Sequence, residues 1–547
     1  MNLIILGLFL ILVCSFVVIK YHKLRREQSL MPPMVPGRRF FGNYYDLAKE
    51  PIHLSLTRLG QDYTHAFTIQ VFGHVMVVLN SRQSITEMLN SKTIELAARP
   101  TCLLIQLATN NAKDLVFSRP NLQWLQLRTA FHKFFSDMKK LHDRKDITEI
   151  VFRDEWCNIL PKLEANSNKK SPYEIKNLIY EAQSKIMSVI LFGEEVAEEA
   201  LLIEQIRKLD TMSKNVIANL YYVMMNMKPL ESIFDNSGLS LLCQALKLQK
   251  NLLGQILLKA TSQTRTSSSS AESDNICLRS LVDLMISLLN LDKPMFTQDQ
   301  IKNVLTELIF AGIDGIVVSV NAFILYMCLH KDVQQRVFEE LSECVQGDFV
   351  QLSDKKSVNL TNACIHETLR LVSQIPLGIF RKTVTKSNVC GYEVPADTVV
   401  IPNLWKLHHD ESVYQDAFKF NPDRFMENGV FRVDECMHLY AFGAGKRACP
   451  GKNVAINLIF LFVSNLVKNF EFELVDSVDE DPRSFILSSQ VEPPNYRVRS
   501  AFRSTQSQTS LVQTTAKKSE IKTLCTDRSS FIKSIQDTEP HLTDDEF

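Results

Sequence analysis

A cysteine with unusual neighbours, Cys449, lies in the segment Phe442-Gly-Ala-Gly-Lys-Arg-Ala-Cys-Pro-Gly451. Nearby Arg and Lys charges and helix N-terminal amides stabilise a thiolate, while glycines let the backbone approach a bulky partner. No second Cys, His or Asp stands at the spacing of a zinc site. The segment therefore predicts either a thiolate that binds a large group or a buried cysteine beside a helix start.

The complete pattern is more specific than the cysteine. Phe-x-x-Gly-x-Arg-x-Cys-x-Gly resembles the haem-ligand signature of the cytochrome P450 family, and its five defined positions are filled by Phe442, Gly445, Arg447, Cys449 and Gly451. The resemblance implies that these residues bind haem b. It also implies that Cys449 is the metal ligand, an axial thiolate on the haem iron.

Three further residues are candidates for cofactor binding. Trp124 and Arg128 are four apart, so on a helix they share a face and can offer an indole N–H and a guanidinium to one anion. An ordinary helix-surface pair explains them equally well. They resemble the Trp-x-x-x-Arg helix of the family, which implies a contact with a haem propionate. Arg381 resembles another propionate-binding arginine.

A long apolar helix is predicted from Thr297 to about Leu329. Thr297 can cap it, Gln300 completes a capping box, and Phe296 can pack on Ile301. Its apolar part is long enough for a membrane span, but it contains Asp314 and Asn321, and a central carboxylate is costly in lipid. We therefore expect a buried central helix.

This helix contains Ala311-Gly-Ile-Asp-Gly-Ile316, and an interior glycine costs about 1 kcal/mol relative to alanine. Close helix packing is one explanation. The segment also resembles the oxygen-binding motif of the family, which implies catalytic positions at Asp314 and Gly315, with Asp314 in the proton path. Gly315 stands where the family usually has a threonine that hydrogen-bonds oxygen, and this departure leaves the reaction type open.

Glu367 and Arg370 can form an ion pair at i,i+3 spacing on a helix, and such pairs usually mark only a solvated face. Together with Arg424, which lies roughly fifty residues later, they resemble the buried Glu-Arg-Arg network of the family. The resemblance implies that these three residues are structural and stabilise the segment that precedes the haem-binding loop.

Residues 1–20 are predicted to be a membrane anchor. Residues 3–19 are apolar except for Ser15, and basic residues follow them from Lys20 onward. A cleaved signal peptide is the alternative, but the positive charge follows the apolar run and no small-x-small cleavage site comes after it. By the positive-inside rule, the rest of the chain faces the cytosol. The resemblance to the microsomal members of the family implies a single-pass protein of the endoplasmic reticulum membrane.

The other boundaries follow from composition. A basic, proline-rich hinge covers 21–40, the catalytic domain 41–500, a flexible serine-rich loop 261–275, and a disordered tail 501–547. We expect a hairpin over 67–79, short strands over 384–404 and mainly helices over 120–260. Lys plus Arg and Asp plus Glu both number 61, which gives no reason to expect a nucleic-acid partner. Twelve scattered cysteines favour a reducing compartment.

The resemblance implies a mainly α fold with a small β-sheet portion, the cytochrome P450 fold, preceded by a transmembrane helix. It implies a monooxygenase that uses O2, a lipophilic small molecule and electrons from NADPH-cytochrome P450 reductase, with cytochrome b5 as a further candidate partner. Gly315 favours an alternative, an isomerase or dehydratase of lipid peroxides that needs no external electrons. A haem-binding sensor or carrier without turnover is the third hypothesis.

Overall fold

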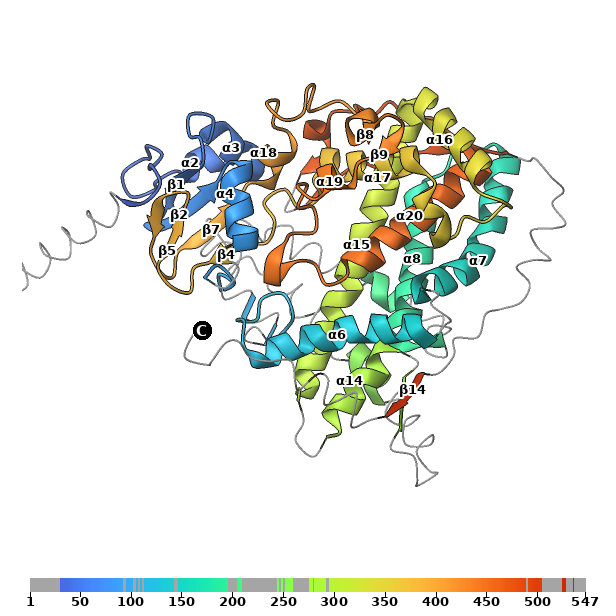
Figure 1. Ribbon diagram of the computed structural model, residues 1–547, viewed down its shortest axis with the longest axis horizontal. Coiled ribbons are helices and arrows are strands. Elements are labelled where there is room, and N and C mark those ends of the chain that lie inside the picture. The colour runs from blue at the N-terminus through green and yellow to red at the C-terminus, as the bar shows by residue number, and fades with distance from the viewer. Residues whose placement is uncertain are drawn as a thin grey trace, which may run out of the picture.

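The longest helix, α15 (Gln298–Leu329), runs through the middle of the protein, as Figure 1 shows. The Thr297 hydroxyl accepts a hydrogen bond from the Gln300 amide at 3.2 Å, and the Gln300 side chain accepts one from the Thr297 amide at 2.8 Å. The predicted capping box is therefore confirmed. Asp314 and Asn321 are buried within the protein, and so is most of the apolar stretch around them.

The computed structural model describes residues 30–503, together with 524–527 and 535. Within the first range it does not describe 195–203, 209–243 and 259–274, nor shorter segments at 92–94, 102–104, 107–108, 111–112, 142–145, 245–246, 249–250, 279, 292–294 and 488–489. The predicted anchor, the first part of the predicted hinge (21–29) and nearly all of the serine-rich loop lie outside the described residues. Among the described residues, α15 alone is long and apolar enough to cross a membrane, and 78% of an apolar 18-residue window within it is buried.

Helices pack around α15 through apolar faces that form one large core. The prediction of helices after residue 120 is confirmed for the described part. The surrounding helices are α6 (Leu122–Leu141), α7 (Ile147–Lys169), α8 (Ile175–Phe192), α14 (Leu281–Leu289), α16 (Lys331–Cys344), α17 (Asn359–Val372) and α20 (Lys452–Asn469). Short helices α2 (Tyr44–Leu47), α3 (Ile52–Leu59), α4 (Arg82–Thr86) and α18 (Leu404–His408) lie beside the sheet, and α19 (Val433–Cys436) lies farther along the chain.

The main sheet joins both ends of the chain in the order β1-β2-β7-β4 (Figure 1). Its strands are β1 (Ala66–Val71), β2 (His74–Leu79), β7 (Val399–Pro402) and β4 (Arg381–Lys382). The β1–β2 pair is the predicted hairpin, with positive φ at both turn residues, Phe72 and Gly73, as a tight hairpin requires. Alternate residues of the strands enter two separate cores, one on each face. The small predicted sheet is confirmed.

The short remaining strands pair locally, except at the C-terminus. They are β5 (Ser387–Val389) with β6 (Tyr392–Val394), β8 (Met426–Glu427) with β9 (Val430–Phe431), β10 (Phe470–Leu474) with β13 (Val498–Phe502), and β11 (Ile486–Leu487) with β12 (Val491–Glu492).

The C-terminal segment differs from the disordered tail predicted for 501–547. Strand β13 continues to Phe502, and β14 (Leu524–Asp527) pairs with β3 (Asn275–Leu278). Ile535 is fully buried in the large core. These are the described residues of the segment, and the disorder predicted for the rest of 501–547 stays a prediction. Their strand partner and core site are formed by distant segments, which composition does not reveal.

Candidate active site

The Cys449 loop is a tight turn before α20. Gly443 and Gly445 have φ of 64° and 66°, a backbone conformation that favours glycine. The Cys449 amide donates to the Phe442 carbonyl at 2.8 Å, which closes the loop. Gly451 is the residue before the first turn of α20, so the cysteine lies at the N-terminal end of that helix.

The environment of the Cys449 sulfur is mixed. Its side chain is exposed at the surface of the loop. Desolvation by the surrounding protein raises the pKa of the thiol, whereas the Gly451 N–H and the charges of Arg128 and Lys452 lower it. A helix N-terminus and two cations are the features that stabilise a thiolate ligand.

Trp124 of α6 departs in one respect from the role implied for it. Its indole N–H donates to the Leu115 carbonyl at 2.9 Å, so this N–H is already engaged with the backbone. The ring instead contacts two cations, with the guanidinium carbons of Arg128 and Arg447 at 5.2 Å and 4.3 Å from its centroid. Trp124 therefore contributes by orienting the two guanidinium groups through cation–π contacts rather than by presenting its N–H.

Four arginines from distant parts of the chain gather at this place, and we call them the arginine cluster. Arg381, Arg447 and Arg99 are 7%, 7% and 6% exposed, and Arg128 is half-buried. Arg128 donates to the Ala448 carbonyl, next to Cys449, at 2.8 Å. The structure thus brings together the three arginines predicted from sequence.

Arg99 is the member that the sequence did not indicate. It donates to the carbonyls of Ile379 at 2.6 Å and Phe380 at 2.9 Å, immediately before Arg381. No spacing or motif distinguishes it, because its role depends on a contact between segments about 280 residues apart.

Burial and mutual repulsion destabilise the charge of the cluster. Desolvation, followed by the charges of Arg447 and Arg128, lowers the pKa of Arg381 to about 9. Desolvation, followed by Arg99 and Arg128, lowers the pKa of Arg447 to about 8. A guanidinium stays protonated in proteins, so both arginines remain charged. Their lowered pKa values therefore indicate that burying several positive charges close together costs free energy.

The described residues supply little negative charge to balance the cluster. Two acidic groups lie close to it, the buried Asp114 and the half-buried Glu307 of α15, and each affects the pKa of the other. Burial and the Asp114 charge raise the pKa of Glu307 well above its usual value, which favours its neutral form. Arg381 makes no ion pair or side-chain hydrogen bond within the described part of the chain.

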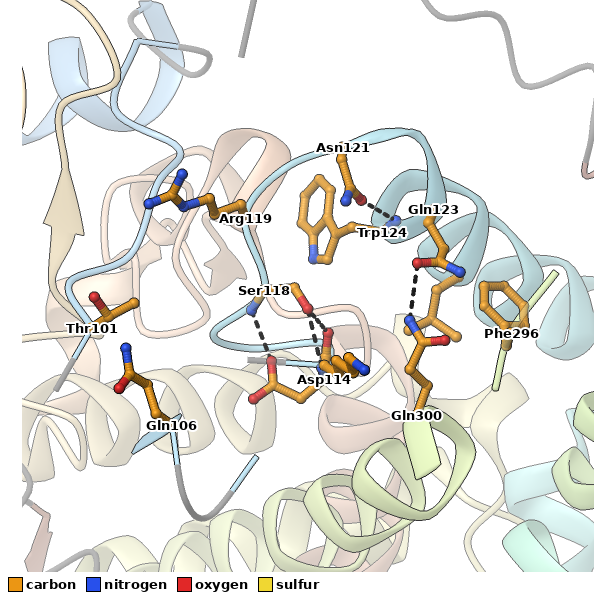
Figure 2. A pocket seen from close by; sticks show the side chains of 12 residues that line it. Thr101, Gln106, Asp114, Ser118, Arg119, Asn121, Gln123, Trp124, Phe296 and Gln300 are labelled. Carbon is orange, nitrogen blue, oxygen red and sulfur yellow. Dashed lines mark hydrogen bonds between the residues drawn. The ribbon is translucent and has the colours of Figure 1, made fainter. Parts of the chain in front are cut away.

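A cavity of about 380 Å³ lies beside the cluster, at the start of α6 (Figure 2). Trp124, Asp114 and Arg119 line it together with side-chain amides, and Gln300 of α15 donates to Gln123 of α6 across it at 3.0 Å. Its lining does not include Cys449 or Arg381. The cavity therefore marks the edge of the arginine cluster rather than the thiol itself.

The central part of α15 presents small residues. Ala311 is exposed although most of the helix is buried, and a Cβ built on Gly315 meets no atom within 4 Å. A Cβ on Gly312 would instead collide with the flexible Met187 side chain, which indicates close helix packing there. The Asp314 side chain is buried. Ser319 donates to the Gly315 carbonyl at 2.7 Å, so its hydroxyl is engaged within the helix.

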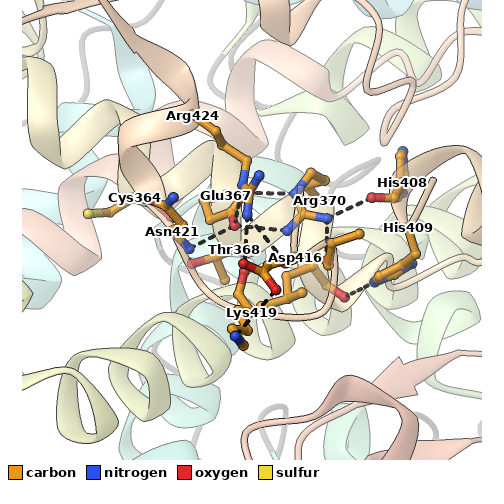
Figure 3. A network of polar contacts seen from close by, with 12 residues as sticks. Cys364, Glu367, Thr368, Arg370, His408, His409, Asp416, Lys419, Asn421 and Arg424 are labelled. Atoms are coloured by element: carbon orange, nitrogen blue, oxygen red, sulfur yellow. Dashed lines mark hydrogen bonds and ion pairs between the residues drawn. The ribbon is translucent and has the colours of Figure 1, made fainter. Parts of the chain in front are cut away.

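Glu367, Arg370 and Arg424 form a buried network (Figure 3). The Glu367 carboxylate accepts from Arg370 at 2.7 Å and 2.8 Å and from Arg424 at 3.0 Å. The Glu367 and Arg370 side chains are 0% exposed. Arg370 also donates to the carbonyls of His408 and Ala417, so the network ties α17 to the segment before the cysteine loop.

The donor set fits a haem. A thiol at a helix N-terminus provides one ligand for an iron atom, and the arginine cluster provides excess positive charge for an anion with carboxylate groups. Arg381 in particular is a buried cation that needs such a partner. The small residues of α15 leave room for a flat, bulky group.

Comparisons with known proteins agree with this fit. The family model described as cytochrome P450 matches residues 32–498. A steroid 17-alpha-hydroxylase/17,20 lyase of Squalus acanthias is 24% identical over 501 residues, which cover 90% of this chain and 95% of the relative. An isoflavone 2'-hydroxylase of Glycyrrhiza echinata is 26% identical over 86% of this chain and 91% of its own length.

A solved zebrafish cytochrome P450 structure with progesterone has a similar fold. It superposes with a TM-score of 0.69 at 22% identity, over 82% of this chain and 99% of its own. The mainly helical fold with a small sheet is therefore confirmed. By the family match over most of its length, this chain belongs to the cytochrome P450 family, whose members are haem-thiolate enzymes with cysteine-ligated haem b.

Proposed function

We propose that this chain is a haem-thiolate monooxygenase that inserts one atom of O2 into a lipophilic small molecule. Electrons come from NADPH through NADPH-cytochrome P450 reductase. The observation that carries the proposal is the arginine cluster beside Cys449, because Arg381 is buried there and no carboxylate of the described residues pairs with it. The cluster would bind the carboxylates of an anionic haem, and Cys449 would be its thiolate ligand.

The bound haem supplies oxygen activation, and the protein supplies the ligand, the orientation and the electrostatics. Cys449 is the proposed axial thiolate, and Phe442, Gly445 and Gly451 shape the loop that presents it. Arg128, Arg381, Arg447 and Arg99 hold the carboxylates. Trp124 orients two of these arginines.

We assign substrate binding and proton delivery to the middle of α15. Exposed Ala311 and the open side of Gly315 provide a small-residue surface for an apolar molecule. Asp314 is the proposed proton carrier because it is the acidic residue of this segment. The names of the compared proteins include steroid hydroxylases, so sterols and steroids are the first substrates to screen.

A reductase would dock near the cysteine loop. Lys452 is exposed and Lys446 half-exposed there, and both flank Cys449. Cations on this face are complementary to an acidic partner, with cytochrome b5 as a second candidate.

The test is a spectrum followed by a turnover assay. Reduced protein with carbon monoxide is expected to show the red-shifted Soret band of the family, and Cys449→Ser is expected to lose it while remaining folded. A folded, haem-loaded wild type without this band contradicts the assignment of Cys449. With reductase and NADPH, we expect product that depends on oxygen.

Gly315 favours a second candidate, a lipid peroxide isomerase or dehydratase, because no hydroxyl occupies the family's threonine position. Rearrangement of a lipid hydroperoxide without reductase or NADPH would support it. Gly315→Thr is a matched variant, since a Cβ meets no atom within 4 Å at this position. The monooxygenase proposal predicts more oxygenated product per NADPH in this variant. A haem-bound protein that shows neither reaction would be the sensor or carrier of the third hypothesis.

We propose that residues 1–20 anchor the protein in the endoplasmic reticulum membrane, that 21–40 form the hinge and that 41–500 form the catalytic domain. Exposed aromatic residues at the end of the hinge and just after it support membrane contact, since Phe40 is 80% and Tyr45 40% exposed. The Arg38 guanidinium carbon lies 4.7 Å from the Tyr45 ring centroid. Aromatic and basic residues are typical of a lipid–water interface.

Brominated lipids quench tryptophans that enter a bilayer, and this provides a test on the full chain. The native tryptophans at 124, 156 and 405 are at most 4% exposed, so a new one dominates the quenching. We expect quenching for Phe40→Trp and none for Val430→Trp, a control on β9 that is 59% exposed at the wild-type residue. Equal quenching of both variants would contradict the proposal that the surface around Phe40 contacts the membrane.

A further inference from the structure

Two described parts of the C-terminal tail, β14 and Ile535, contact the body of the protein. Strand β14 pairs with β3, which comes shortly before α14, and β14 also contacts α6 (Figure 1). Farther along the chain, Ile535 is 0% exposed and belongs to the large core. The tail thus lies next to the helix that carries Trp124 and Arg128.

The register of this strand pair places two cysteines opposite each other. Leu524 pairs with Leu278, and Cys525 pairs directly with Cys277. No other strand pair that the structure describes has this arrangement.

The spacing of an antiparallel ladder suits a disulfide. Directly opposite residues have Cα atoms about 4.5 Å or 5.5 Å apart, depending on their hydrogen bonding. Disulfides form over Cα separations of about 4.4–6.8 Å. Either kind of pair therefore meets the distance condition, and opposite residues share one face of the ladder.

We propose that Cys277 and Cys525 are an oxidation site at which a hydroperoxide produces an intrachain disulfide that ties the tail to the body. One thiolate attacks the peroxide oxygen, which yields a sulfenic acid and releases water or an alcohol. The second thiol displaces the sulfenic hydroxyl as water. The two thiols lose two electrons and two protons, and the peroxide bond accepts them.

The bond would change how firmly the tail is held. A two-stranded ladder of four residues is marginal by itself, so the reduced β3–β14 pair is weakly held. The disulfide makes the contact covalent. In a reducing cytosol the pair stays a dithiol until an oxidant is present.

Mass spectrometry of the full chain in detergent micelles tests the proposal. Protein is treated with hydrogen peroxide or with dithiothreitol, blocked with N-ethylmaleimide and digested with trypsin without reduction. Cleavage after Arg265, Arg279, Lys522 and Arg528 releases the two cysteines on peptides 266–279 and 523–528. We expect these peptides to be linked after peroxide treatment and separate, with both thiols labelled, after dithiothreitol.

Single variants distinguish a specific bond from general oxidation. Cys277→Ser is expected to abolish the link and leave Cys525 open to maleimide, whereas Cys344→Ser, which changes an exposed cysteine on α16, is expected to leave the link intact. The proposal is overturned if both residues stay labelled at peroxide concentrations that oxidise Cys344, or if they link to other cysteines instead. Neither result bears on haem binding.

Discussion

Two groups of buried arginines lie in this protein, and their surroundings are opposite. Arg370 and Arg424 converge on one carboxylate, Glu367, with three charge-assisted hydrogen bonds of 2.7–3.0 Å. The arginine cluster has four guanidinium groups, for which the nearby acids are Asp114 and a Glu307 that favours its neutral form.

The difference separates a structural site from a binding site. Buried charge is costly unless it is paired, so a network that pairs its own charges needs no ligand. A cluster that leaves positive charge unbalanced is prepared for an anion from outside the chain. Substitutions in the first site should therefore affect folding, and those in the second should affect haem affinity.

The largest effect is expected from Glu367→Gln. It leaves Arg370 and Arg424 without their carboxylate in a site where Glu367 is 0% exposed, which should cost about 3–5 kcal/mol of unfolding free energy. Denaturant unfolding measures this loss, and haem retention should fall with it. The matched control is Asp423→Asn, which breaks an exposed pair with Arg336 and should cost less than about 1 kcal/mol. An equal loss of unfolding free energy in both variants would show that the buried network stabilises the protein no more than an exposed ion pair does.

An intermediate effect is expected from Arg381→Leu. A charge-assisted hydrogen bond contributes about 1.5–3 kcal/mol, so haem should bind roughly 10- to 150-fold more weakly. The unfolding free energy of the haem-free protein should fall little, because Arg381 has no ion pair to lose among the described residues. Haem transfer to apomyoglobin measures the affinity, and Arg336→Leu serves as the surface control. A large loss of unfolding free energy in the haem-free protein, with unchanged haem transfer, would show that Arg381 has a structural role and not a role in haem binding.

The smallest effect is expected from Glu307→Gln, which makes the same chemical change as Glu367→Gln. Glu307 favours its neutral form, and a glutamine oxygen can still accept the 2.8 Å hydrogen bond from the Leu115 amide. Unfolding free energy should change by less than about 1 kcal/mol, in the range of a single neutral hydrogen bond. A loss as large as that of Glu367→Gln would mean that Glu307 is ionised and balances the arginines.

Sequence patterns predicted the local elements well. The capping box at Thr297, the hairpin around Gly73 and the burial of Asp314 in a central helix are all confirmed. Each depends on neighbours within a few residues or on one apolar stretch. The strand at Leu524 was missed because its partner, β3, lies about 250 residues earlier in the chain.

The sequence by itself determined the family, through the residues around Cys449 and the spacing of Trp124 and Arg128 on one helix. Only the tertiary structure decided how these residues are used. It placed Arg99 in the cluster, engaged the Trp124 indole with a backbone carbonyl and brought Asp114 close enough to Glu307 to raise its pKa. Such outcomes depend on the burial and charge of groups brought together from distant segments, and a linear pattern carries neither quantity.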